Sequence, residues 1–239
     1  MILDDGYFYG LGAFETIAIE SGTPVFLPEH LTRLHKALDF LQINKTITPD
    51  MVKDAIHKEG ISRGALKLTV SEQNTGITFR ENPYTADSYK QGFRLRFCDT
   101  LRNDTSPFTY HKTLNYGDCI LEKRKCTQTG HDEAIFLNHR GELCEGTTSN
   151  IFFLKDGHIH TPQLSCGLLP GILRAYLLQR YDITETAITA EEIPDFDECF
   201  VTNSLLGIMP VSSLGDMQFT ESKMAMHLQA EYRAHVTSL

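Results

Sequence analysis

The stretch Tyr110-His111-Lys112-Thr113-Leu114-Asn115-Tyr116 places one lysine among aromatic and apolar residues, directly before a predicted helix. Partial burial makes an amine in such a setting a usable nucleophile. By itself the pattern decides little, because most lysines beside apolar residues lie at the protein surface. Its meaning depends on two segments that follow it in the chain.

The first of these segments, Glu145-Gly146-Thr147-Thr148-Ser149-Asn150, puts an acid at the end of a predicted strand. The small hydroxyl residues after the acid can either fix a loop or hold an anion. In the second segment, Leu169-Pro170-Gly171-Ile172-Leu173-Arg174, a Pro-Gly turn opens a helix. The free amides at a helix N-terminus can bind a phosphate, but every helix start has such amides.

The composition is that of an ordinary globular protein, with 41% hydrophobic and 22% charged residues among 239. A net charge of −9 argues against a nucleic-acid partner. The six cysteines include no C-x-x-C pair and follow no secretion signal, which is typical of reduced thiols. No apolar run approaches the roughly 18 residues that a membrane span requires. We therefore expect a cytoplasmic protein that binds neither nucleic acid nor membrane.

Motifs for nucleotide and metal chemistry are missing from the sequence. Gly10-Leu11-Gly12 lacks the third glycine of a dinucleotide fingerprint, and there is no G-x-x-x-x-G-K-[ST] or H-E-x-x-H motif. His158 and His160 have no acidic or cysteine partner at ligand spacing. We expect no metal site.

The hydrophobic pattern predicts mixed helices and strands. Apolar and polar residues alternate in 65–70 and 93–97, which is typical of half-buried strands. Further strands are expected at 13–19, 133–137, around Leu143, and at 151–154, 158–160 and 198–202. An Asp156-Gly157 hairpin turn is expected to join 151–154 to 158–160. Helices are expected from Pro28 through the stripe Leu31, Leu34, Leu38 and Leu41, then at about 49–58, 116–129, from 171 and at 220–236. The stretch 74–86 is predicted to be a loop.

The region 99–107 has turn formers and charges but little apolar content, so we place a lobe boundary there. Strands grouped with helices in each half predict α+β lobes packed against each other. We expect a smaller N-terminal lobe at 1–100 and a larger C-terminal lobe at 101–239 that carries Lys112.

Six blocks in one order resemble the fold-type-IV pyridoxal-phosphate enzymes, which include branched-chain and D-amino-acid aminotransferases and 4-amino-4-deoxychorismate lyase. The resemblance spans nearly the whole chain and implies a two-lobed, D-amino-acid-aminotransferase-like α+β fold with pyridoxal 5'-phosphate in the interlobe cleft. Family members are commonly homodimers, so a homodimer is expected. The blocks are Asp5 to Thr16, Glu29 to Leu34, His111 to Tyr116, Glu145 to Phe152, Leu169 to Arg174 and Val201 to Leu206.

The resemblance implies a role for each matching residue. Lys112 is expected to hold the cofactor covalently and later to move a proton, and Glu145 to keep the pyridine nitrogen protonated. Arg33 lies off the leucine stripe and is expected to reach the cleft and clamp the cofactor phosphate. The other expected phosphate ligands are the amides of Ile172 and Leu173 together with Asn203 and Ser204.

The segments Phe14-Glu15-Thr16 and Thr202-Asn203-Ser204-Leu205 are more similar to the aminodeoxychorismate lyases than to the transaminases. The resemblance implies elimination that yields pyruvate and 4-aminobenzoate, an intermediate of folate biosynthesis. Thr16 matches a lyase threonine that assists proton delivery to the leaving group, although a structural hydroxyl is the alternative. Arg80 is a candidate for binding a substrate carboxylate.

Two other functions remain open: a branched-chain or D-amino-acid aminotransferase, and a non-catalytic small-molecule-binding protein on the same fold. The presence of both Lys112 and Glu145 disfavours the binding protein. Leu11 stands where many family members carry Asp. Phe14 stands where D-amino-acid transaminases carry Tyr, and this difference disfavours a D-amino-acid transaminase. The chain also starts almost at its first block, without the strands that usually precede it.

Overall fold

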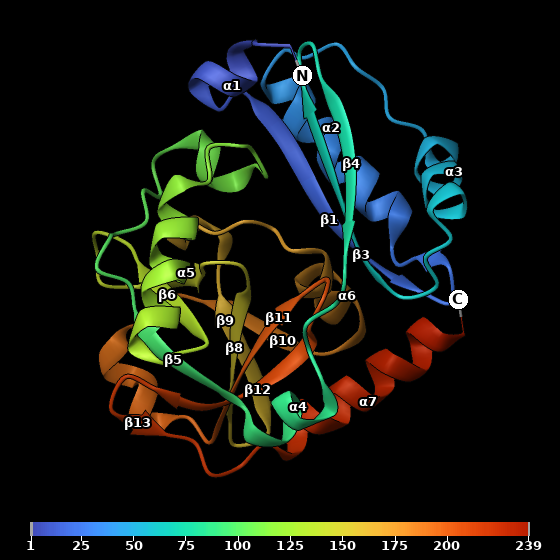
Figure 1. Cartoon of the computed structure of the whole chain (residues 1–239). Coiled ribbons are helices and arrows are strands. Elements are labelled where there is room, and N and C mark those ends of the chain that lie inside the picture. Colours follow the sequence, from blue (N-terminus) through green and yellow to red (C-terminus); the bar gives the residue numbers. More distant parts are fainter. Residues whose placement is uncertain (1, 239) are drawn as a thin grey trace. The chain divides into compact units, whose positions relative to one another are not determined.

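The computed structural model describes residues 2–238, which form two compact units. The first unit contains the residues up to Pro83, the segment His111–Tyr116 and the residues from Ala234 onward. The second contains Tyr84–Tyr110 and Gly117–Arg233 (Figure 1). The segment His111–Tyr116 belongs to the first unit, where Thr113 forms a bridge with Ala13.

The first unit is built on a four-stranded antiparallel sheet in the order β2-β1-β3-β4. Side chains alternate along a strand, so one face of β1 carries Ala13, Ile17 and Ile19 into a core with leucines of α2. That face is covered by the two longer helices of the unit. The elements are α1 (Asp5–Tyr9), β1 (Gly12–Glu20), β2 (Thr23–Pro24), α2 (Leu27–Phe40), α3 (Pro49–Glu59), β3 (Gly64–Ser71) and β4 (Thr75–Arg80).

The second unit is built on a nine-stranded mixed sheet in the order β10-β9-β8-β11-β12-β5-β6-β7, with β13 paired to β12. β5 runs parallel to both of its neighbours. The strands are β5 (Phe93–Phe97), β6 (Glu133–Leu137), β7 (Leu143–Gly146), β8 (Asn150–Lys155), β9 (His158–Pro162), β10 (Ile183–Thr186), β11 (Glu198–Asn203), β12 (Gly207–Leu214) and β13 (Met217–Gln218).

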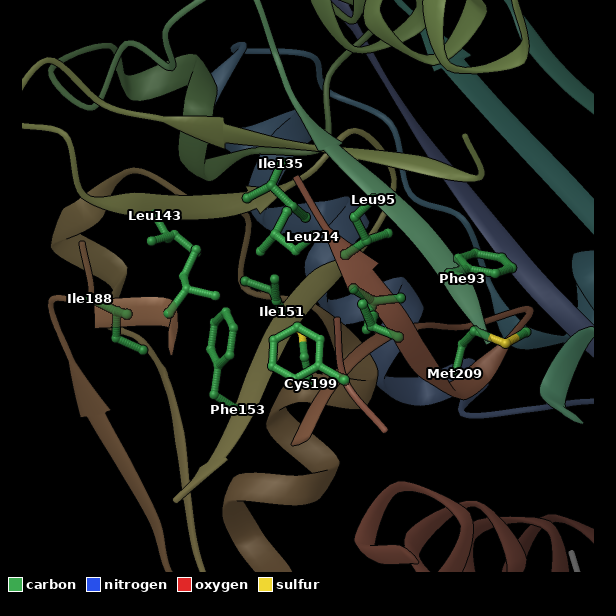
Figure 2. Packing of buried hydrophobic residues seen from close by; sticks show 14 of the residues in the cluster. Phe93, Leu95, Ile135, Leu143, Ile151, Phe153, Ile188, Cys199, Met209 and Leu214 are labelled. Carbon is green, nitrogen blue, oxygen red and sulfur yellow. The ribbon is translucent and has the colours of Figure 1, made fainter. Parts of the chain in front are cut away.

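Helices and apolar side chains cover this second sheet. Figure 2 shows part of its core, with Leu143, Phe153 and Ile188 at one side and Met209 beside Phe93 at the other. The helices are α4 (Ala86–Gln91), α5 (Gly117–Thr129), α6 (Ile172–Arg180) and α7 (Lys223–Thr237), with short 3-10 turns at Pro107–Tyr110, Leu164–Cys166 and Ala190–Asp195. No helix within residues 2–238 is long and apolar enough to cross a membrane.

Most of the predicted elements are present, and one prediction is wrong. The Asp156-Gly157 turn joins β8 to β9 with both residues at positive φ, 51° and 81°, as a tight hairpin requires. Within the predicted loop 74–86, residues 75–80 form β4, which pairs with β3 over six residues, and only 74 and 81–85 lie outside any helix or strand. The short helices α1 and α4 and the strands β2, β10, β12 and β13 were not predicted.

Candidate active site

Lys112 lies in the first unit, on a segment that extends the sheet beside β1. Thr113 forms an antiparallel bridge with Ala13, and the Phe14 amide donates to the Lys112 carbonyl at 3.0 Å. The Lys112 side chain is partly buried, with its Nζ 4.4 Å from the centroid of the Phe14 ring and 5.3 Å from that of Tyr116. The sheet therefore fixes the backbone of this lysine while two aromatic rings flank its amine.

Thr16 lies on the same face of the sheet as Phe14, because it is two residues further along β1. It is half-buried and is paired in register with Lys67 of β3. The Lys67 amine lies 4.9 Å from the centroid of the Phe14 ring. Arg80, at the exposed end of β4, is on this face too, since it is paired with Ala65. One face of the sheet thus presents amines, a guanidinium and a hydroxyl.

The opposite face of β1 carries a buried ion cluster centred on Glu15, whose side chain is 0% exposed. The Arg33 guanidinium donates from Nε to Oε1 at 2.8 Å and from Nη2 to Oε2 at 2.7 Å. Nδ1 of His30 lies 2.7 Å from Oε2. Burial alone would raise the pKa of Glu15, but Arg33 and His30 outweigh it and lower the pKa to about 2. Glu15 is therefore ionised, and the buried His30 donates its Nδ1 proton to it.

This cluster changes the description of Arg33. The sequence predicted a side chain directed away from the core, whereas the structure ties its guanidinium to Glu15 and leaves the side chain 12% exposed. Glu15 and His30 were not identified as site residues. A signal was present for Glu15, because it shares the core-facing side of β1 with Ala13 and Ile17. A carboxylate on such a face requires a buried cation.

Glu145 lies in the second unit, at the end of β7, with 7% of its side chain exposed. Nη2 of Arg102 donates to its Oε1 at 2.6 Å, and the Leu169 amide donates to its Oε2 at 3.0 Å. Both carboxylate oxygens are thus held in place. Arg102 comes from the segment 99–107, which the sequence marked only as a boundary, so this partner was missed.

The hydroxyl residues after Glu145 fix a loop, which decides between the two alternatives that the sequence left open. The hydroxyls of Thr147, Thr148 and Ser149 all donate to the buried carboxylate of Glu133, Thr148 at 2.7 Å and Ser149 at 3.3 Å. The Thr147 amide donates to the same carboxylate at 3.2 Å. Glu133 therefore holds the turn that follows Glu145.

The N-terminus of α6 carries the expected amides of Ile172 and Leu173 in its first turn. Its N-cap is Gly171, and no side chain caps it. A Cβ at Gly171 would stand 2.0 Å from Oδ1 of Asn150, so only glycine fits there. Asn150 in turn donates from Nδ2 to the Leu169 carbonyl at 3.0 Å, which anchors the entry to the helix.

Asn203 uses its side chain to shape the turn in which Ser204 lies. Its Oδ1 accepts from the amides of Leu205 and Leu206, both at 2.9 Å, and its Nδ2 donates to the Thr148 carbonyl at 3.2 Å. Ser204 is partly exposed in this turn. Asn203 thus connects its own turn to the loop that follows Glu145.

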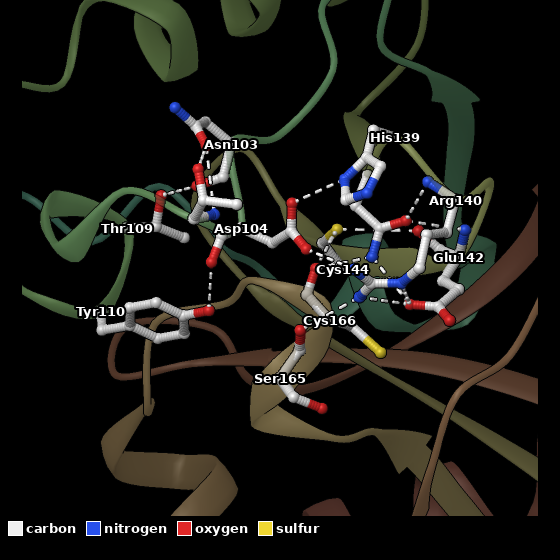
Figure 3. Close-up of polar contacts among 12 residues, drawn as sticks. Asn103, Asp104, Thr109, Tyr110, His139, Arg140, Glu142, Cys144, Ser165 and Cys166 are labelled. Atoms are coloured by element: carbon white, nitrogen blue, oxygen red, sulfur yellow. Dashed lines mark hydrogen bonds and ion pairs between the residues drawn. The ribbon is translucent and has the colours of Figure 1, made fainter.

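A polar network around Asp104 fixes the segment that precedes the Lys112 stretch (Figure 3). The Asp104 carboxylate pairs with Arg140 at 2.6 Å and His139 at 3.0 Å, and its carbonyl accepts from the Tyr110 hydroxyl at 2.6 Å. Cys144 donates from Sγ to the Cys166 carbonyl at 3.0 Å in the same network. The chain is therefore firmly held up to Tyr110.

Comparison with known families identifies the chain. Residues 12–214 match the family described as amino-transferase class IV. The chain belongs to this family. The match covers both carboxylate clusters, the Lys112 segment and the start of α6, so the expected fold-type-IV α+β class is confirmed. Members of the class IV family are pyridoxal-phosphate-dependent enzymes, lyases or aminotransferases.

Individual relatives have both kinds of activity in their names. The chain is 26% identical to an aminodeoxychorismate lyase of Bacillus subtilis (strain 168), over 99% of this chain and 89% of the relative. It superposes on the crystal structure of 4-amino-4-deoxychorismate lyase from Pseudomonas aeruginosa with a TM-score of 0.81 and 26% identity, covering 98% and 94% of the two chains. A branched-chain amino acid aminotransferase from a T.th. strain, solved with pyridoxamine 5'-phosphate, gives a TM-score of 0.87 at 22% identity, covering 100% and 89%. This last likeness shows the fold alone.

The residues of this class IV enzyme fit pyridoxal 5'-phosphate. Lys112 supplies a partly buried amine, and Glu145 supplies a buried carboxylate whose two oxygens are fixed. The uncapped start of α6, where Gly171 leaves no space for a Cβ, supplies backbone amides for an anion. The chain thus offers each kind of group that this cofactor requires.

Proposed function

We propose that the protein is a 4-amino-4-deoxychorismate lyase that releases 4-aminobenzoate and pyruvate. The observation that carries this proposal is the face of β1 shared by Phe14 and Thr16, with the Lys112 amine over the Phe14 ring. Elimination needs a base at the amino-bearing carbon and an acid at the leaving oxygen. An amine and a hydroxyl on one sheet face supply that pair.

Relatives with the lyase name support this proposal, and relatives named as branched-chain aminotransferases keep the second activity open. The Bacillus subtilis protein, matched over 99% of this chain, is named as an aminodeoxychorismate lyase. The Pseudomonas aeruginosa structure with that name is also more similar in sequence, at 26% identity, than the aminotransferase structure, at 22%. Phe14-Glu15-Thr16 fits the lyase as well.

Each candidate residue has a separate task in this reaction. Pyridoxal 5'-phosphate, when bound, withdraws electrons from the carbon that bears the substrate amino group. Lys112 would hold this cofactor, and Glu145 would pair with its ring nitrogen. Arg33, oriented by Glu15, binds the phosphate. The remaining phosphate ligands are the amides of Ile172 and Leu173 and the turn of Asn203 and Ser204.

The protons and bonds balance without an added reactant. The substrate amine would first take the place of Lys112 on the cofactor, and the freed Lys112 amine would then accept the proton from the amino-bearing ring carbon. The bond between the neighbouring ring carbon and the ether oxygen then breaks, and the ring becomes aromatic. The Thr16 hydroxyl delivers a proton to the departing enolpyruvyl group, which leaves as pyruvate. Thr16 is thus the acid and Lys112 the base.

Product analysis tests the activity. Purified enzyme supplied with 4-amino-4-deoxychorismate is expected to release pyruvate and 4-aminobenzoate in equal amounts. The same enzyme supplied with leucine or D-alanine and 2-oxoglutarate is expected to form little glutamate. Glutamate formation faster than pyruvate release would replace the lyase with an aminotransferase.

Substitution of Thr16 tests the proposed acid. Thr16→Ala is expected to lower kcat about a hundredfold, the scale of one general acid, and Thr16→Ser to retain most of it. Thr78→Ala is the matched control, because Thr78 lies in the same cross-strand row, on the far side of Lys67. Equal activity of Thr16→Ala and Thr78→Ala would make Thr16 a structural hydroxyl.

We also propose that the enzyme works as a cytoplasmic homodimer. The six cysteines are all free thiols, which is typical of a reducing compartment. The aromatic residues of α1, Tyr7, Phe8 and Tyr9, are 58–70% exposed, which leaves apolar surface for a subunit contact. Sedimentation equilibrium measures the state directly, and a monomer at micromolar concentration would contradict the proposal.

A further inference from the structure

Arg102 and Glu145 form a nearly buried ion pair within the second unit. Nη2 of Arg102 lies 2.6 Å from Oε1 of Glu145, and the two side chains are 16% and 7% exposed. The partners are 43 residues apart in the chain, so the pair exists only because the fold brings them together. A guanidinium this close to a carboxylate strongly favours its ionised form.

Arg102 is itself held firmly by the second unit. Its amide donates to the Leu137 carbonyl at 2.8 Å, beside the end of β6. Its Nη1 lies 3.5 Å from Sγ of Cys119 in α5, and its guanidinium lies 5.3 Å from the centroid of the Phe136 ring. Backbone, thiol and aromatic contacts thus place the guanidinium in a fixed position. Its charge is therefore a permanent feature of the surroundings of Glu145.

The Glu145 carboxylate is held from a second direction as well. The Leu169 amide donates to Oε2 at 3.0 Å, so each oxygen has a separate donor. A carboxylate with both oxygens fixed cannot rotate to suit a ligand. The plane that it presents is set before any ligand binds.

The location of a proton shared between Glu145 and a pyridine nitrogen depends on the charge of Arg102. When a buried carboxyl group faces a pyridine nitrogen, the proton between them can sit on either atom. Burial favours the neutral arrangement, with the proton on the carboxyl oxygen. A neighbouring guanidinium favours the carboxylate, so the proton moves to the nitrogen. The presence of a guanidinium beside the carboxyl group therefore decides whether the carboxyl oxygen or the pyridine nitrogen carries the proton.

We propose that Arg102 is a positioning residue that keeps the proton on the ring nitrogen of the cofactor by holding Glu145 oriented and ionised. This inference rests on the proposed role of Glu145. A protonated ring nitrogen is what makes the ring an electron sink. Arg102 contributes through Glu145 and needs no contact with substrate or cofactor.

The test uses cofactor labelled with ¹⁵N at the ring nitrogen, loaded into the full-length enzyme and observed by NMR. In the wild type the signal is expected at the position of a protonated pyridine. In Arg102→Gln it should move most of the way toward the unprotonated position at neutral pH. Turnover should fall at least about tenfold, because a change of one pKa unit shifts the proton equilibrium between Glu145 and the ring nitrogen tenfold. Arg102→Lys keeps a charge without the planar fork and should move the signal by a smaller amount.

Arg96→Gln is the matched control in the same unit. Arg96 pairs with the buried Glu122 at 3.0 Å, and its side chain is also 16% exposed. Its loss should lower the melting temperature of the cofactor-free protein to a similar extent and leave the ¹⁵N signal in place. A role confined to stability would make the two glutamine variants indistinguishable in the spectrum.

Glu145→Gln separates the role of Arg102 from the role of Glu145. If its ¹⁵N signal moves while those of Arg102→Gln and Arg102→Lys stay at the wild-type position, the role of Arg102 is wrong and that of Glu145 stands. If the signal of Glu145→Gln does not move either, the proposed role of Glu145 fails as well. Should Arg102→Gln not fold, the movement in Arg102→Lys decides alone, and an unmoved signal overturns the inference.

Discussion

Glu15→Gln removes the negative charge at the centre of the buried cluster in the first unit. Three donors converge on this carboxylate, two from Arg33 at 2.8 and 2.7 Å and one from His30 at 2.7 Å. None of its side chain is exposed. A glutamine in its place leaves the Arg33 charge without its partner, in a side chain that is only 12% exposed. The loss of one partner from a buried pair destabilises a protein more than the pair itself stabilises it.

The magnitude follows from the pKa of Glu15, which falls from an ordinary 4.5 to about 2 in the fold. Each unit is worth about 1.4 kcal/mol, so the ionised carboxylate stabilises the folded chain by about 3 kcal/mol at neutral pH. Because the folded pKa is the lower one, this contribution is complete above pH 4.5. It is lost as the pH falls toward 2, and about 2 kcal/mol of it should be gone at pH 3.

Guanidinium denaturation followed by far-UV circular dichroism measures this effect. At pH 7 the free energy of unfolding of Glu15→Gln is expected to be at least about 3 kcal/mol below that of the wild type, and the gap should shrink by about 2 kcal/mol at pH 3. Glu20→Gln is the control from the same strand. Glu20 pairs with Arg63 at 3.4 Å with side chains 35% and 62% exposed, so its loss should cost under about 1 kcal/mol. A Glu15 variant as stable as the Glu20 variant, or a gap independent of pH, would refute the reasoning.

Three further predictions concern single residues. Lys112→Ala should fold and bind cofactor only reversibly, so that borohydride no longer fixes the cofactor to the chain. Mass spectrometry detects any covalent label, and label in this variant would exclude Lys112 as the attachment site. Glu133→Gln should weaken the turn after Glu145 by about 1–3 kcal/mol, because one amide replaces a carboxylate that serves three hydroxyls, and faster hydrogen exchange at the Thr147 amide checks this. Gly171→Ala should lower stability by about 1–3 kcal/mol, because the added Cβ would stand 2.0 Å from Oδ1 of Asn150. It should also weaken cofactor binding, which equilibrium dialysis measures. Gly76→Ala is the control, since a Cβ there has nothing within 4 Å and should leave binding unchanged.

The sequence predicted best the elements that bury one regular face. The stripe of α2 and the alternation of β3 show in the residues because each has a core side and a solvent side. β4 was missed because it is a half-exposed edge strand whose core-facing row has only two apolar residues, Ile77 and Phe79, beside Gly76 and Thr78. β12 is buried on nearly every residue and contains Pro210, so it shows no alternation. α1 buries nothing, and only its caps, Asp4 and Gly10, mark it.

The sequence indicated the candidate acid Glu145 and the candidate amine Lys112, but not the partners that hold their side chains. Lys112 and Glu145 stand out by their position in ordered blocks, and the comparison with the family confirms those blocks as a class IV chain. Arg102 shows no local pattern, since a charged residue in a loop is ordinary. Asn203 was predicted as a phosphate ligand from its block, yet its side chain is engaged by Leu205, Leu206 and the Thr148 carbonyl. Pairs that are distant in sequence, or a side chain that bonds its own turn, become visible only once the backbone is folded.

Each of two buried carboxylates in this chain is bound to an arginine from elsewhere in the chain. Glu15 holds Arg33 across 18 residues, and Glu145 is held by Arg102 across 43. A buried carboxylate without a cation would take up a proton and lose the charge that the proposed chemistry uses. The two ion pairs therefore work in opposite directions. Glu15 orients Arg33 in the first pair, and Arg102 orients Glu145 in the second. It follows that Arg33→Lys and Arg102→Lys, although both keep the charge, should each impair the enzyme, because a single ammonium cannot supply two fixed donors.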